Sequence, residues 1–88
     1  MNEDIAGADT VWQLPARSAA AAGPLGVLFL AHGCKHRATD FWPFSPTCAD
    51  CIGLPEEKRI VRAALAIGWA AIAVSSKDRR SGCWDAKA

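Results

Sequence analysis

Two short apolar stretches, residues 26–31 and 69–75, stand out in the pattern of hydrophobic and polar positions. Neither contains a charged residue, and each has the length of a strand rather than that of a helix. The first is opened by Pro24 and closed by His32 and Gly33. Continuous apolar sequences of this kind are typical of strands that are buried on both faces of a parallel sheet. We therefore expect both stretches to be strands of such a sheet.

The segment between these stretches has helical periodicity near its end. Pro55 suits the first position of a helix, and the acidic residues Glu56 and Glu57 would lie at the positive end of the helix dipole. Gly68 can adopt the left-handed backbone conformation that commonly ends a helix. One apolar face at helical spacing is formed by Ile60, Val61, Ala64, Leu65 and Ile67. The sequence predicts a helix from 55 to about 67, preceded by a long loop over 34–54.

Strand, loop, helix and strand make a β-α-β unit, whose right-handed crossover places the two strands parallel. Residues 11–14 predict one short strand before it, because valine and tryptophan favour a pleated surface. The rest of 1–24 is expected to be irregular. The predicted fold class is α/β, with a parallel sheet and one β-α-β unit in a domain over 25–88. Only one helix is available to cover two sheet faces, so this sheet is expected to be incomplete.

Charge and hydropathy argue against several classes of partner. The net charge is +1 with both signs interspersed, so the chain has no electrostatic footprint for nucleic acid. The longest apolar stretch, 25–31, is far shorter than the roughly 20 residues that cross a bilayer, and we expect no membrane span. Residues 1–4 are acidic where a secretory signal is positively charged. The sequence does not assign a cellular location, although it favours the cytoplasm. The alternative is that the chain lacks its true N-terminus.

Four cysteines raise a metal and a redox question. Without a secretory signal we expect thiols rather than stable disulfides. A set of zinc-preferred residue types with suitable spacing is formed by Cys34, His36, Cys48 and Cys51. A small zinc-binding interaction module is therefore an alternative function. Cys34 and Cys83 both follow the ends of predicted strands, so they are either two unrelated thiols or a bridged pair.

The segment His32-Gly33-Cys34 lies where chemistry is expected. In open parallel sheets, ligands bind beyond the carboxyl ends of the strands. Gly33 allows the backbone to turn sharply and to approach a ligand, and it leaves the next amide N–H groups free to donate hydrogen bonds. The simpler interpretation is that Gly33 only turns the chain.

Several motifs together resemble the α/β-hydrolase superfamily, in particular a set of plant and algal α/β-hydrolase-like proteins. The motifs are Leu-Phe-Leu-Ala-His-Gly-Cys at 28–34, Asp-Phe-Trp at 40–42, a Cys-x-x-Cys followed by Gly-Leu-Pro-Glu within 48–56, and Ser-Ser followed by Cys-Trp at 75–76 and 83–84. The resemblance implies that the loop after the third strand donates one backbone N–H to an oxyanion hole. The donor would be the N–H of Cys34, with Gly33 shaping the turn. The implied activity is hydrolysis of a small-molecule ester or acyl substrate.

The sequence departs from this family at the nucleophile. No serine has the flanking glycines of the G-x-S-x-G elbow, so no catalytic residue is assigned. His32 and His36 would also precede the nucleophile, against the order of the family. We therefore expect an N-terminal fragment of a hydrolase that is inactive alone and meets substrate only when completed. Self-association through the uncovered sheet is a further expectation.

Overall fold

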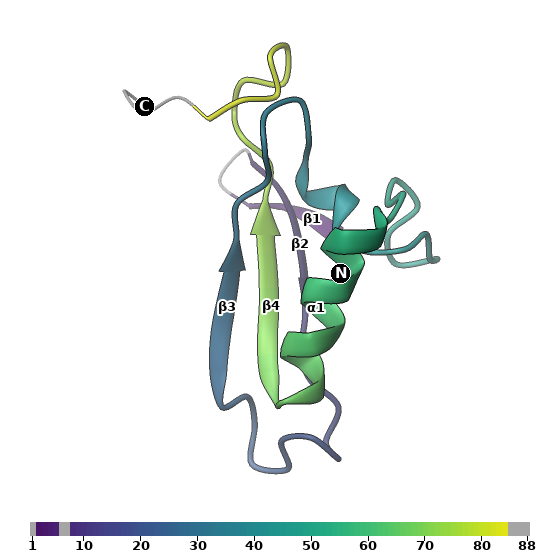
Figure 1. Cartoon of the computed structure of the whole chain (residues 1–88), viewed down its shortest axis with the longest axis vertical. Coiled ribbons are helices and arrows are strands. Elements are labelled where there is room, and N and C mark those ends of the chain that lie inside the picture. The colour runs from purple at the N-terminus through teal and green to yellow at the C-terminus, as the bar shows by residue number, and fades with distance from the viewer. Residues whose placement is uncertain (1, 6–7, 85–88) are drawn as a thin grey trace.

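The computed structural model describes residues 2–5 and 8–84, which form a four-stranded sheet with an α-helix packed against it (Figure 1). The strands are β1 (Asn2–Ile5), β2 (Ala8–Gln13), β3 (Gly26–Leu30) and β4 (Trp69–Val74). Their spatial order is β1-β2-β4-β3. β2 runs antiparallel to both of its neighbours, whereas β3 and β4 are parallel.

The predicted β-α-β unit is confirmed. β3 and β4 pair in parallel from Gly26 opposite Trp69 to Leu30 opposite Ala73. The helix α1 (Pro55–Ala66) lies between them in the chain and packs beside β4 (Figure 1). The sheet as a whole is mixed rather than parallel, because β2 hydrogen-bonds to β4 in the opposite direction.

The N-terminal segment contains more regular structure than its sequence predicts. Besides the strand expected at 11–14, β1 and β2 form an antiparallel hairpin that extends the sheet. The expectation of a largely irregular segment is therefore wrong for residues 2–5 and 8–10, whereas 14–24 contains neither strand nor helix. Polar residues can also form strands where their side chains bond across a hairpin. Trp12 Nε1 donates such a hydrogen bond to Glu3 Oε1 over 2.6 Å.

The ends of α1 follow the local signals in the sequence. Pro55 occupies the start of the helix, and the first turn carries two acidic residues. Gly68 ends it with a φ of 89°, and a Cβ at this position would lie 2.8 Å from the carbonyl oxygen of Ala19. Within the described residues, no helix is both long and apolar enough to cross a membrane.

The core lies between the sheet and α1. It is formed by buried residues from the strands, the helix and the long loop: Val11, Leu30, Ala38, Phe41, Trp42, Cys48, Cys51, Val61, Ala71 and Ala73. Trp42 also donates a hydrogen bond of 2.8 Å from Nε1 to Gln13 Oε1. The long loop, which includes the short 3-10 helix η1 (Ala38–Asp40), is therefore held to the sheet by its aromatic residues.

The opposite face of β3 is open. Val27 is 62% exposed and Phe29 is 57% exposed, so the prediction of a strand buried on both faces is wrong for β3. No helix among residues 2–5 and 8–84 packs on this face, and β3 is also an edge strand. The apolar face predicted for the helix is likewise only partly buried, since Ile60 and Ile67 are exposed. The expected incomplete cover of the sheet is confirmed.

Candidate functional site

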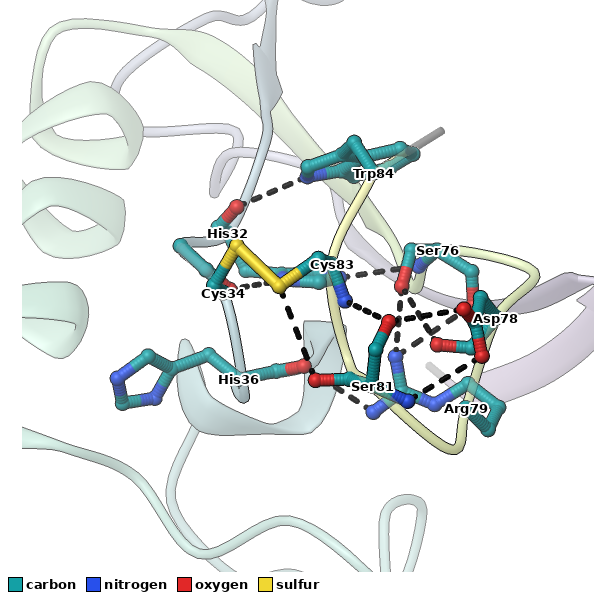
Figure 2. Close-up of a disulfide and its surroundings, with 10 residues drawn as sticks. His32, Cys34, His36, Ser76, Asp78, Arg79, Ser81, Cys83 and Trp84 are labelled. Carbon is teal, nitrogen blue, oxygen red and sulfur yellow. Dashed lines mark hydrogen bonds between the residues drawn. A yellow bond between two sulfur atoms is a disulfide. The ribbon is translucent and has the colours of Figure 1, made fainter. Parts of the chain in front are cut away.

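The loops that follow β3 and β4 meet at the same end of the sheet (Figures 1 and 2). Cys34 in the first loop and Cys83 in the second form a disulfide whose Cα atoms lie 4.2 Å apart. Parallel strands bring their carboxyl ends to one edge, which is why residues 49 positions apart can bond. The bridged-pair interpretation of these two cysteines is confirmed, and the expectation of free thiols is wrong.

His32 joins the two strand ends from within the protein. Its buried ring accepts a hydrogen bond at Nε2 from the backbone N–H of Ser76, 2.9 Å away. Because Nε2 is an acceptor, the proton of the neutral ring is on Nδ1, which donates to the carbonyl oxygen of Gly33 over 2.7 Å. The ring also stacks on Trp84 at a centroid distance of 4.9 Å. With both nitrogens engaged, His32 is a structural residue.

Gly33 to His36 form a tight turn. The N–H of His36 donates to the carbonyl oxygen of Gly33 over 3.2 Å. Lys35 has a φ of 66° whereas that of Cys34 is negative, the combination found in a type II turn. Gly33 and Cys34 are exposed, and within the described residues no group accepts a hydrogen bond from either of their backbone N–H groups. The turn therefore presents two N–H donors at the strand exit.

The segment 77–84 packs closely on this turn. The N–H of Lys35 donates to the carbonyl oxygen of Gly82 over 2.9 Å. A Cβ on Gly82, whose φ is 69°, would lie 2.7 Å from the Cα of Lys35, so only glycine permits the approach. Trp84 Nε1 donates to the carbonyl oxygen of His32 over 2.8 Å. The disulfide is thus one of several contacts that hold the two loops together.

Arg79 and Asp78 organise the second loop. The guanidinium of Arg79 donates to Ser76 Oγ over 3.0 Å and to the carbonyl oxygen of His36 over 3.1 Å. The carboxylate of Asp78 accepts hydrogen bonds from the backbone N–H and the hydroxyl of Ser81 and from the N–H of Arg80. These bonds, those from Ser81 above all, lower the pKa of Asp78 below its ordinary value of 3.8.

His36 belongs to a different arrangement. Its Nδ1 lies 2.9 Å from Oδ2 of the buried Asp40, which also accepts the backbone N–H of Arg37 over 3.2 Å. The imidazole points away from the Cys34–Cys83 disulfide (Figure 2). The structure therefore does not place this imidazole beside the N–H donors of the turn.

The four predicted zinc ligands are not brought together. Cys34 bonds to Cys83, while Cys48 and Cys51 are buried and form a disulfide with each other. Among the described residues, no group of three His, Cys, Asp or Glu side chains is arranged to hold a metal ion. The spacing in the sequence could not reveal these pairings, because they depend on which loops meet.

Sequence reasoning missed the polar residues that hold the site together. Ser75 and Ser76, at the end of β4, are each 2% exposed. Ser75 Oγ accepts the N–H of Ala38 over 2.9 Å and donates to Asp9 Oδ2 over 3.2 Å. The only signal for their importance was the Ser-Ser motif, which gave no indication of partners so distant in the chain.

No family model, curated protein or solved structure gives a significant match to this chain. Two exposed N–H donors in a rigid turn can stabilise negative charge on an oxygen atom. The His32 ring nearby is fully engaged.

Proposed function

We propose that this chain supplies the N-terminal strands and one oxyanion-hole donor, the N–H of Cys34, to an α/β-hydrolase-type domain that cleaves ester or acyl bonds. The observation that carries the proposal is the turn at 33–36. It follows a strand of a parallel pair and presents N–H groups with no acceptor among the described residues. In the family that the sequence resembles, the loop after the third strand provides this donor. Here β3 is the third strand.

The arrangement of the sheet adds support. The described strands form a mixed sheet of order β1-β2-β4-β3, with β2 antiparallel and β3 parallel to β4, so the parallel pair lies at the side where further strands could be added. β3 has a free edge, and apolar side chains are exposed on both sides of it. They are Val27 and Phe29 on one face and Ile60, Ile67, Trp69 and the half-buried Leu28 near the other. A further strand at this edge would end beside Gly33 and Cys34, where a nucleophile is needed.

The chemical role is electrostatic. During acyl transfer the carbonyl oxygen becomes negatively charged, and a fixed N–H donor stabilises that charge without having to reorganise. The turn is fixed by the disulfide, by the hydrogen bond between Lys35 and Gly82 and by the packing of Gly82. The nucleophile, its base and the second donor would come from the completing part of the domain.

A pair of substitutions at Cys34 tests the proposal. The chain is fused to the remainder of an active α/β-hydrolase that lacks its own first four strands, and hydrolysis of p-nitrophenyl acetate is measured. Cys34→Pro removes the N–H, and proline suits the second position of a type II turn. Cys34→Ala removes the same disulfide but keeps the N–H.

We expect Cys34→Pro to lower kcat by about 10² to 10³ relative to the native fusion, the cost of one oxyanion donor. Cys34→Ala should lower kcat by less, because its N–H is still present although the disulfide that fixes the turn is gone. Equal rates for the two variants in a folded, active fusion would contradict the proposal. Stoichiometric zinc in the purified chain, with all four cysteines titrating as thiols, would favour the zinc-binding alternative instead.

A further inference from the structure

The turn that carries the N–H of Cys34 is held in an unfavourable backbone conformation. Lys35 has a φ of 66°, in the left-handed region that side-chain-bearing residues seldom adopt. Such conformations persist only where the surroundings hold them. Here the neighbouring residue is tied to Cys83, and the N–H of Lys35 is bonded to Gly82. Both restraints come from the segment 77–84.

The disulfide is the one covalent attachment of the segment 77–84 to the first loop. Its turn at Asp78 is bonded internally and exposed. Gly82 is the only buried residue of the segment. The other attachments are hydrogen bonds that join the two loops through Arg79, Lys35 and Trp84, the stacking of Trp84 on His32 and the packing of Gly82 on Lys35. Each of these non-covalent contacts is weaker than a covalent cross-link, so the disulfide is the strongest single attachment between the two loops.

We propose that the Cys34–Cys83 disulfide is a redox latch: a dithiol reductant opens it and thereby releases the type II turn at 33–36. A thiolate of the reductant attacks Sγ of the exposed Cys34, forms a mixed disulfide and expels the Cys83 thiolate. The second thiol of the reductant then displaces Cys34 as a thiolate. The reductant is oxidised to its disulfide, and the protein gains two electrons and two protons at neutral pH.

Opening of the latch changes the turn through Lys35. With the disulfide broken, the peptide between Cys34 and Lys35 rotates so that Lys35 leaves the left-handed region, and its bond to Gly82 is lost. The oxidised protein holds the donor N–H in place, and the reduced protein does not. The consequence for catalysis rests on the proposed function, whereas the latch itself is a property of the turn.

The second disulfide is the internal reference. Cys48 and Cys51 are 4% and 3% exposed, whereas Cys34 is exposed and Cys83 is half-buried. Thiol–disulfide exchange requires access of the attacking thiolate to sulfur. The Cys34–Cys83 bond is therefore reduced first as the concentration of dithiothreitol rises. Alkylation with iodoacetamide followed by mass spectrometry measures the order, and reduction of Cys48–Cys51 first or at the same concentration would overturn the latch.

Amide hydrogen exchange tests the release directly on the intact chain. Reduction of the latch, or the double substitution of Cys34 and Cys83 by alanine, is expected to speed exchange of the Lys35 N–H by roughly tenfold or more. The variant Lys35→Gly, which tolerates a positive φ, should show a clearly smaller increase. If the exchange rate at position 35 does not rise when the native chain is reduced, the latch is overturned. If the exchange rate rises equally in the native chain and in the Lys35→Gly variant, the role of Lys35 is overturned.

These readouts need no enzymatic activity. If exchange responds to reduction but the rate of the completed fusion does not, the latch stands and its link to the oxyanion donor fails. If neither exchange nor the order of reduction behaves as stated, the latch itself is wrong, whatever the result for the Cys34→Pro variant.

Discussion

The imidazole of His32 accepts the backbone N–H of Ser76 over 2.9 Å, and this contact joins the exits of the two parallel strands. The residues are 44 positions apart in the chain, and the bond is buried. A buried N–H must have an acceptor, so the identity of residue 32 is tied to the end of β4. The same ring supports Gly33, whose carbonyl oxygen accepts a hydrogen bond from Nδ1–H.

His32→Phe is expected to destabilise the protein by about 1–3 kcal/mol. Phenylalanine can still stack on Trp84, but it leaves the buried N–H of Ser76 without an acceptor. Urea unfolding followed by circular dichroism measures the change. Trp84→Phe is the control, because it keeps the stacking and removes only a hydrogen bond at a partly exposed side chain. An unchanged free energy of unfolding for His32→Phe would contradict this account.

The C-terminus of α1 provides a second prediction. Gly68→Ala should lower the free energy of unfolding by about 1–2 kcal/mol, because a residue with a Cβ is unfavourable at a φ of 89°. Its Cβ would also meet the carbonyl oxygen of Ala19 at 2.8 Å, which adds to this cost. Gly23→Ala separates the two effects, since Gly23 has a φ of 107° but nothing within 4 Å of an added Cβ. Urea unfolding should therefore show the larger loss for Gly68→Ala, and a reversed order would be inconsistent with the close approach.

The turn at Asp78 should respond to acid. Hydrogen bonds from Ser81 lower the pKa of this carboxyl below its ordinary 3.8, so the folded turn binds the proton less well than the unfolded chain does. The contribution of Asp78 is therefore fully present above pH 3.8 and is lost as the pH falls through the lowered pKa. Titration of the Asp78 carboxyl carbon by NMR should give a midpoint below 3.8.

Ser81→Ala should raise that midpoint, because it removes the donating hydroxyl. Ser45→Ala, at a serine that bonds only within the long loop, is the matched control. A midpoint at or above 3.8 in the native chain would show that the Asp78 turn is not formed in solution.

Local signals in the sequence were enough to predict the β-α-β unit. Pro55, Gly68 and the two uninterrupted apolar stretches fix its elements without reference to distant residues. The hairpin of β1 and β2 was missed because its pairing rests on polar residues such as Glu3, which have no strand signal of their own.

The candidate site was predictable only in part. Gly33 and Cys34 could be placed at a strand exit, because parallel strands end at the same edge. The contacts that fix their turn come from Arg79, Gly82 and Trp84, which lie more than 40 residues further along the chain. No local pattern specifies such partners. The zinc set failed for the same reason, since residue types and spacing do not determine which cysteines meet.

The exits of β3 and β4 are held together through Cys34 and Cys83. Tryptic digestion under non-reducing conditions, after free thiols are blocked, tests this linkage most directly by mass spectrometry. We expect the peptide 18–35 to be linked to the peptide 81–87, while peptides containing 48 and 51 carry an internal disulfide. A linkage of Cys34 to Cys48 or Cys51 in the folded protein would contradict the account.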